Sequence, residues 1–580
     1  MRTQLLAVLA LAACGRSERV EEPGCDAWRQ WGNDAGHQGA SCVTGQRLEG
    51  TLDNLVYDPF IAQETADARG SLVVHYQAPL IDGDRLYMMS KRGTYIPCAI
   101  VMDEPSCSAP GQEYRRNSQI WVEQHFAIGA GGRLALRWSF ESDWKPEPSV
   151  NFEPMFQPAL AGNLLVVPGA GGAVWQLDAT SGQVVRHVVP FGAVDPDTYV
   201  AGGLAVGPDD TIYYTALKLD HDQPLGLPPA AWLVAVSPDG TARTADWATL
   251  VRDAPQATDA CLGVYDAMIT PLPWPPANPD GSLLAPPSAP CGPQRPGINA
   301  TPAVGPDGTI FVVSRAHHNG RYSYVVAVDP GLSPRWATSL RDILDDGCGV
   351  TNAFEGAENA NMFACRAGAP VGVERVTGLR PAAQVVDDSS SSPVALPDGG
   401  VLYGAFTGYN NSRGHTFKLD ERGAVVATYD FGWDSTPAVF GGPINYKIII
   451  KDNHYGEDED GVDFGPFYIT ALDSSLRAIW RFQSTNTRSC VRQPDGSKDC
   501  VADHPNGFEW CVNAVAVDAD GTVFANSEDG NAYAITPDGK FRDAVFLETS
   551  LGAAYTPIAL DRAGRIFALN NGQLSVLGHK

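Results

Sequence analysis

The hydrophobic positions of this chain fall into short runs separated by turn residues, and one such run keeps returning. The clearest copy spans Thr301 to Val304, followed by a turn over Gly305 to Gly308 and a second run that starts at Thr309. The runs are rich in β-branched and aromatic residues and show no helical periodicity, a pattern that predicts β-strands. A unit repeated in this way cannot bury its apolar face alone, so it must stack on its neighbours.

The repeat recurs along almost the whole chain. The equivalent origins of its copies are Pro79, Pro158, Leu204, Pro302, Pro393, Pro437, Val515 and Pro557. The closest origins lie about 45 residues apart, the length of a four-stranded propeller blade, and the wider gaps fit the same unit carrying an insert. The sequence therefore predicts an all-β fold, an eight-bladed β-propeller of four-stranded antiparallel blades.

The last copy leaves the ring one strand short. From Tyr555 to Lys580 there is room for about three strands. An unpaired edge strand favours aggregation. We therefore expect an N-terminal strand, around Ser71 to His75, to complete the last blade.

The long segments of the chain all fall on one face of the predicted ring. The links between blades and the turns between second and third strands share a face, and the links 250–298, 340–388 and 483–512 are long. Long loops on a rigid scaffold are where function concentrates. A polar small molecule, glycan or peptide would suit the side chains gathered there. The candidate ligand-binding residues are Gln77, Gln157, Asn299, Ser392, Asp434 and Asn513 at the central funnel, and His317, His318, Arg413 and His415 on the loops.

Composition and net charge limit the classes of partner that we expect. The formal net charge is −26, from 67 acidic and 41 basic residues, and such a surface repels nucleic acid. With 60 Gly and 44 Pro the chain is rich in turn residues. We expect no nucleic-acid partner and a monomer.

The N-terminus indicates export. Leu11-Ala12-Ala13-Cys14 follows a short apolar stretch and resembles the lipobox of bacterial lipoproteins. The resemblance implies a signal peptide over 1–13, lipidation of Cys14, a tether over 14–27 and one propeller domain over 28–580. It also implies a place in the cell envelope, on the outer membrane and facing the periplasm or the surface, with membrane contact only through the anchor. An ordinary secretory signal is the alternative.

The twelve cysteines suit an oxidising compartment, where disulfides are the default. Sequence neighbours suggest the pairs Cys25/Cys42, Cys98/Cys107, Cys261/Cys291 and Cys348/Cys365, with a fifth pair among Cys490, Cys500 and Cys511. One cysteine of the last three is left over, and Cys490/Cys500 is the candidate pair. Zinc is the alternative, but no Cys-x2-Cys pair exists.

One acidic segment is a candidate Ca²⁺ site. Asp458, Asp460 and Asp463 offer hard oxygen ligands beside a glycine. The segment lacks the helix-flanked calcium-loop pattern, and a solvated acidic hairpin tip is the alternative. Ca²⁺ is the one cofactor that the residues suggest.

Three segments resemble quinoprotein-type propellers. They are the opening Trp28 to Gly39, the blade motif Val174 to Val185, and Ala471 to Phe482, where Trp480 occupies the docking position between blades. The resemblance implies the fold for about 28–580. Quinone-dependent dehydrogenases of this kind share a vicinal Cys-Cys, which is missing here, so pyrroloquinoline quinone is not expected.

Other catalytic signals are weak. The chain has no Gly-x-Ser-x-Gly and no His-Glu-x-x-His. Asp387-Asp388 reads either as paired carboxylates or as a turn. The leading interpretation is a lipid-anchored binding or scaffold protein acting through its loop face. It is similar in style to the lipoprotein propeller of the outer-membrane barrel-assembly machine, from which it departs in length and in its cysteine-bearing loops. An enzyme or ligand sensor using the central funnel is the alternative.

Overall fold

The computed structural model describes most of the chain. The described residues are 27–67, 74–97, 99–101, 104–106, 118–146, 152–219, 230–262, 277–282, 284–350, 370–373, 379–407, 410, 413–455, 465–552 and 555–579. Over these ranges no helix is long and apolar enough to cross a membrane.

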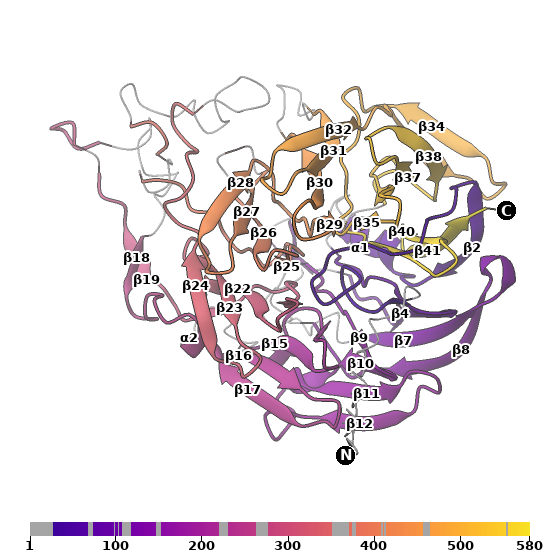
Figure 1. The fold of residues 1–580 in the computed structure, drawn as a ribbon, viewed down its shortest axis with the longest axis horizontal. Helices are drawn as coiled ribbons and strands as arrows, with labels where there is room; N and C mark the ends of the chain where they lie inside the picture. The colour runs from indigo at the N-terminus through magenta and orange to yellow at the C-terminus, as the bar shows by residue number, and fades with distance from the viewer. Residues whose placement is uncertain are drawn as a thin grey trace, which may run out of the picture.

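Eight antiparallel sheets stand around one axis, and the chain visits them in order from indigo through magenta and orange to yellow (Figure 1). Blade 1 consists of β1 (Ala27–Trp28), β3 (Leu80–Asp82), β4 (Arg85–Gly93), β7 (Gln119–Ile128) and β8 (Leu134–Glu141), and blade 2 of β9 (Ala159–Ala161), β10 (Leu164–Pro168), β11 (Val174–Asp178) and β12 (Val184–Val188). Blade 3 consists of β13 (Thr198–Val200), β14 (Ala205–Val206), β15 (Ile212–Lys218), β16 (Ala230–Val236) and β17 (Ala242–Asp246). Blade 4 consists of β20 (Gln294–Pro296), β21 (Ala303–Val304), β22 (Ile310–Ala316), β23 (Ser323–Val328) and β24 (Pro334–Ser339).

Blades 5 to 8 complete the ring. Blade 5 consists of β25 (Val394–Ala395), β26 (Val401–Ala405), β27 (His415–Leu419) and β28 (Val425–Tyr429), and blade 6 of β29 (Ala438–Phe440), β30 (Lys447–Asn453), β31 (Phe467–Leu472) and β32 (Ala478–Gln483). Blade 7 consists of β35 (Ala516–Val517), β36 (Val523–Asn526), β37 (Asn531–Ile535) and β38 (Phe541–Phe546). Blade 8 consists of β39 (Ile558–Leu560), β40 (Ile566–Asn570), β41 (Gln573–Gly578) and β2 (Gly50–Val56). The predicted eight-bladed propeller is confirmed.

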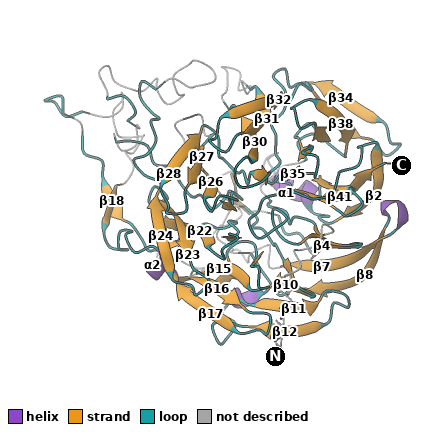
Figure 2. Ribbon diagram, viewed as in Figure 1, coloured by secondary structure: helices purple, strands orange, loops and turns teal. Residues whose placement is uncertain are grey.

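Little else is regular in the described part of the chain, as the strand-dominated colouring of Figure 2 shows. Three small hairpins project from the blades: β5 (Ala99–Val101) with β6 (Glu104–Ser106), β18 (Ala260–Leu262) with β19 (Ser288–Pro290), and β33 (Arg488–Arg492) with β34 (Lys498–Ala502). The helices are short: α1 (Ile61–Asp67), α2 (Trp247–Leu250), and the 3-10 turns η2 (Ala130–Gly132) and η3 (Ala170–Gly172).

An N-terminal strand closes the ring, but it is not the predicted one. β2 pairs with β41 of blade 8, whereas Val74 forms only an isolated bridge with Glu153. An outermost strand buries little of its surface, and most of β2 is partly exposed. Its sequence therefore lacks the apolar signal that drew the prediction to Ser71–His75. Ser71 to Val73 lie outside the described residues, and Val74 and His75 are buried.

Residues 27–46, here named the hub segment, run around the axis before β2 begins. At six successive blades the hub segment accepts a hydrogen bond from the backbone N–H of an innermost strand, over 2.6–2.9 Å. The donors are Leu160, Val206, Val304, Ala395, Val439 and Val517, each two residues after the repeat origin. The segment also pairs with β3 of blade 1 and reaches Gly564 of blade 8.

The hub segment explains why the repeat is so regular. The donated N–H groups lie at the ends of the innermost strands, beside the short turns, so we name this side of the ring the turn face and the opposite side the loop face. Trp31, Ala78, Met155 and Ala514 form a buried apolar cluster inside the ring. A buried backbone N–H must find an acceptor, and the hub segment supplies one to blade after blade.

Two predicted disulfides are confirmed. Cys261 pairs with Cys291 and Cys490 with Cys500, while Cys511 is free. Cys42 and Cys348 are also disulfide-bonded. Their predicted partners, Cys25 and Cys365, lie outside the described residues, as do Cys14, Cys98 and Cys107.

Candidate functional site at the loop face

The six predicted funnel residues lie at the loop-face ends of the innermost strands, and all are buried. Five of the six side chains connect one blade to another, and Gln77 bonds within blade 1. Gln157 accepts from the N–H of Ala78, Asn299 from that of Met155, Ser392 from that of Thr301, and Asp434 from that of Ser390, over 2.7–2.9 Å. Gln77 accepts from Met89 and donates to Glu123, and Asn513 donates to Ser390. In the described structure the Oδ2 of Asp434 and the Oδ1 of Asn513 are buried without a hydrogen-bond partner, and the role of these residues in ligand contact stays a prediction.

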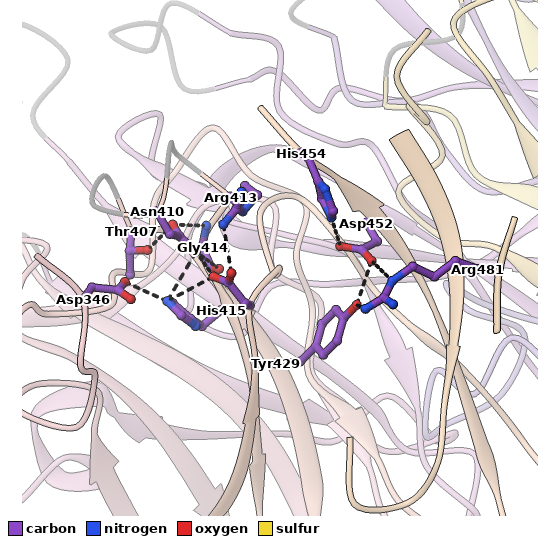
Figure 3. A network of polar contacts seen from close by, with 11 residues as sticks. Asp346, Thr407, Asn410, Arg413, Gly414, His415, Tyr429, Asp452, His454 and Arg481 are labelled. Atoms are coloured by element: carbon purple, nitrogen blue, oxygen red, sulfur yellow. Dashed lines mark hydrogen bonds and ion pairs between the residues drawn. The ribbon is translucent and has the colours of Figure 1, made fainter. Parts of the chain in front are cut away.

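His415 and Arg413 belong to a buried ionic network of blade 5 (Figure 3). The Nε2 atom of His415 lies 2.7 Å from Asp346, which comes from the blade 4–5 link. Arg413 pairs with Asp430 at 2.8 Å. Burial lowers the pKa of His415, but Asp346 and Asp430 outweigh it, so this pKa is raised. The network ties a long link to a blade edge.

A second network lies on blade 6, beside the first (Figure 3). Asp452 accepts hydrogen bonds from Tyr429 at 2.7 Å and from Thr470 at 2.8 Å, and it pairs with Arg481 at 3.4 Å. The other carboxylate oxygen lies 3.4 Å from the Nε2 of His454. Burial would raise the pKa of Asp452, but these partners hold it below its usual range. One carboxylate oxygen of Asp452 is therefore bonded to residues of blades 5 and 6, while the other faces His454.

The His415 network predicts a specific dependence on pH. Because the folded-state pKa of His415 is raised, the stability that it contributes is fully present below the ordinary value of 6.5 and is lost as the pH rises through the folded-state pKa. Asp346→Asn removes the negative charge that contributes most to raising the pKa of His415. We expect the variant to titrate His415 at lower pH and to lose this part of the pH dependence, as measured by histidine NMR and urea unfolding. An unchanged titration of His415 would contradict the assignment.

His317 and the Asp387-Asp388 pair meet on blade 4. Asp387 lies between Arg295 at 2.7 Å and Arg315 at 3.1 Å, and Arg295 also donates to His317. Burial raises the pKa of Asp387, but the two arginines overcome it and hold the pKa far below its usual range. Burial raises that of Asp388. Asp387 is therefore an ion-pair partner rather than an acid–base group. His318 packs against His317 with ring centroids 4.6 Å apart.

The sequence reasoning missed one cluster of possible metal ligands. Ligand atoms of Glu509, Cys511 and Glu528 lie within 4.8 Å of one another, each side chain partly buried. Burial and the neighbouring Glu528 raise the pKa of the Cys511 thiol, which donates to Glu528 over 2.8 Å. The arrangement is a thiol–carboxylate hydrogen bond that could exchange its proton for a soft cation. Only the prediction of one unpaired cysteine among the last three pointed to it.

The remaining predicted ligands cannot be placed. Asp458, Asp460 and Asp463 lie outside the described residues. The Ca²⁺ site stays a prediction.

Comparisons with known proteins give low-identity matches to solved structures. A europium-containing methanol dehydrogenase matches with 11% identity and a TM-score of 0.46, over 95% of this chain and 90% of the other. A quinohemoprotein alcohol dehydrogenase from Comamonas testosteroni matches with 12% identity and a TM-score of 0.46, over 96% and 81%. BamB from Moraxella catarrhalis matches with 11% identity and a TM-score of 0.34, over 84% and 100%. No protein-family model matches the chain, and no curated protein does.

The residues present do not fit the quinone of such dehydrogenases. Vicinal cysteines are missing from the sequence. Five of the six funnel side chains form hydrogen bonds between blades, and Trp31 and Met155 are buried inside the ring.

Proposed function

We propose that this chain is an exported, lipid-anchored propeller that binds an envelope protein through its loop face. One observation carries the proposal. The hub segment crosses the ring on its turn face, an apolar cluster lies buried inside the ring, and five of the six funnel side chains bond between blades, so the elaborated surface is the loop face. Two confirmed disulfides restrain hairpins on that face, which lowers the entropy lost on binding.

The tether supports the same arrangement. Ala27 pairs with Asp82, beside the turn that joins β3 to β4 on the turn face. A lipid on Cys14 would therefore hold the turn face toward the membrane and present the loop face to a partner. Such a protein works as a monomer in the envelope and has no need of nucleic acid. Cys14→Ser is expected to move the protein from the detergent phase to the aqueous phase in a detergent partition, and a wild-type protein already in the aqueous phase would contradict the anchor.

Site-specific photo-crosslinking tests the loop face. Val501 lies on the β33–β34 hairpin and is 61% exposed, whereas Ile444 lies on the turn face and is 82% exposed. A photoreactive residue at 501 should give one discrete crosslinked species in intact cells, and the same residue at 444 should not. Equal crosslinking at both positions, or none at 501 and at further loop-face positions such as Val371, would contradict the proposal.

A ligand sensor or enzyme at the funnel mouth is the second candidate, favoured by Glu509, Cys511 and Glu528. Glu528→Gln separates the two functions. The substitution should leave crosslinking at 501 unchanged under the binding function. Loss of a small-molecule response with crosslinking retained would favour the sensor or enzyme.

A further inference from the structure

A groove lies between the outer strands of blades 6 and 7. It consists of two adjoining hollows of about 550 Å³ and 400 Å³, which share Gln483, Ser484 and Thr485. Trp480 closes the end toward the turn face, where its indole N–H donates to Pro537 and its ring lies over Gly539. The two hollows together have the size of ordinary small-molecule sites.

The walls of the groove are almost uncharged. Of the fifteen residues that line the two hollows, only Arg481 is charged. Its guanidinium already contacts Asp452 and Tyr429. In a chain of net charge −26, a surface without a carboxylate neither attracts a cation nor offers a second charge to an anion. The groove therefore selects a neutral ligand.

The remaining wall residues supply rings and hydrogen-bonding groups side by side. Phe482, Tyr533 and Phe541 present aromatic surface, and Phe541 is 58% exposed. Gln483, Asn486 and Asn531 add amide groups that both donate and accept. Aromatic faces suit the C–H surface of a sugar ring, and amides suit its hydroxyl groups.

The groove is also held in shape before any ligand arrives. The Tyr533 hydroxyl and the Asn486 amide both donate to the fully buried Asp529, over 2.5 Å and 3.0 Å. Trp510 packs beneath, with ring centroids 5.2 Å from Tyr533 and 5.9 Å from Phe482. A preformed wall loses little entropy on binding.

We propose that this groove binds a neutral oligosaccharide, with sugar rings stacked on Tyr533 and Phe541 and hydroxyl groups bonded to the neighbouring amides. One end of the groove, at Thr487 and Pro505, belongs to the 483–512 link of the loop face, but the proposed stacking residues lie on β37 and β38 and do not depend on the partner proposed above. A peptide is the competing occupant, because β32 pairs only with β31 among the described strands and its outer edge could accept a strand.

Titration of the full chain with defined probes tests the groove. The probes are maltotriose and triacetylchitotriose, with trigalacturonate as the charged control and an uncharged extended hexapeptide as the competing ligand. Calorimetry and saturation-transfer NMR should show at least one neutral trisaccharide binding with a dissociation constant of about 1 mM or tighter. The charged sugar and the hexapeptide should bind more weakly.

Two variants locate the binding. Phe541→Ala should weaken the trisaccharide about tenfold, because it removes an exposed stacking surface without opening the core. Val426→Ala is the matched control, since Val426 is 55% exposed on the outer strand of blade 5, and it should bind as the wild type does. Failure of both neutral probes, tighter binding of the hexapeptide, or equal affinity in the Phe541→Ala variant would overturn the proposal. Crosslinking at 501 is read independently of all these outcomes.

Discussion

Gly39→Ala is expected to lower the free energy of unfolding by about 3–5 kcal/mol. Gly39 has φ of +61°, a conformation that costs a residue with a side chain roughly 1–3 kcal/mol. An added Cβ would lie 2.7 Å from the carbonyl oxygen of Val515 and 3.0 Å from the Cβ of Ala438. Forcing apart two innermost strands adds overpacking of about 1–3 kcal/mol. Urea unfolding followed by tryptophan fluorescence measures the loss.

Gly131→Ala provides the matched control. Gly131 has φ of +66°, nearly the same backbone conformation, but nothing lies within 4 Å of an added Cβ. This variant should lose only the conformational part, about 1–3 kcal/mol. The difference between the two variants measures how tightly the hub segment packs against blades 6 and 7. Equal losses would mean that the hub segment is not held there as described.

Lys91→Met is expected to cost about 3–5 kcal/mol at neutral to alkaline pH, because it leaves buried carboxylates without a counter-ion. The ammonium of Lys91 is fully buried and lies 2.7 Å from Asp58, 2.9 Å from Glu64 and 2.8 Å from Glu153. Burial lowers the pKa of Lys91, but the three carboxylates raise it by more than burial lowers it, so the net pKa is raised and the lysine stays charged. One cation faces three acids in a space without solvent.

The excess of acid groups fixes the sign of the pH dependence. Burial, opposed by Lys91, raises the pKa of Glu64 to about 8. A carboxyl group whose pKa is raised in the folded state stabilises the protein through its protonated form. For Glu64 this stabilisation is fully present below pH 4.5, the ordinary pKa, and is lost as the pH rises through about 8. The wild-type protein should thus become less stable across this window. The Lys91→Met loss should be larger at about pH 8 than at about pH 5, where the carboxylates can take up protons.

Lys540→Met is the control for the loss of a lysine. Lys540 pairs with Asp538 on an exposed turn, and its removal should leave unfolding unchanged at both pH values. If Lys91→Met were as stable as the wild type, or if its loss were the same at both pH values, the buried cluster would not carry the charges assigned to it.

The proposed activities rest on surfaces rather than on the central funnel. The funnel positions Gln157, Asn299 and Asp434 accept hydrogen bonds from backbone N–H groups of other blades. The proposals therefore use the blade 6–7 groove and the loop face. Propellers with a rigid ring and variable rims allow a division of this kind.

The sequence by itself determined the periodic part of this protein. Each blade is a local meander of neighbouring strands, so the recurring run of Thr301 to Val304 and its turn predicted strand, turn and blade from residues close together in the chain. In blade 4 the run Thr301 to Val304 and the run from Thr309 match β21 and β22 within two residues at their starts. The disulfides Cys261–Cys291 and Cys490–Cys500 likewise join sequence neighbours.

Only the tertiary structure decided what joins distant segments. The hub segment contacts residues as far away in the sequence as Gly564. Nothing in the sequence of Trp28 to Gly39 reveals which backbone N–H groups donate hydrogen bonds to it. The closing strand β2 was missed because an outer strand needs little apolar sequence. His415 and Arg413 suggested a ligand site, yet Asp346 and Asp430 neutralise them from other segments. Burial and charge pairing depend on neighbours in space, and a single sequence does not specify those neighbours outside its repeats.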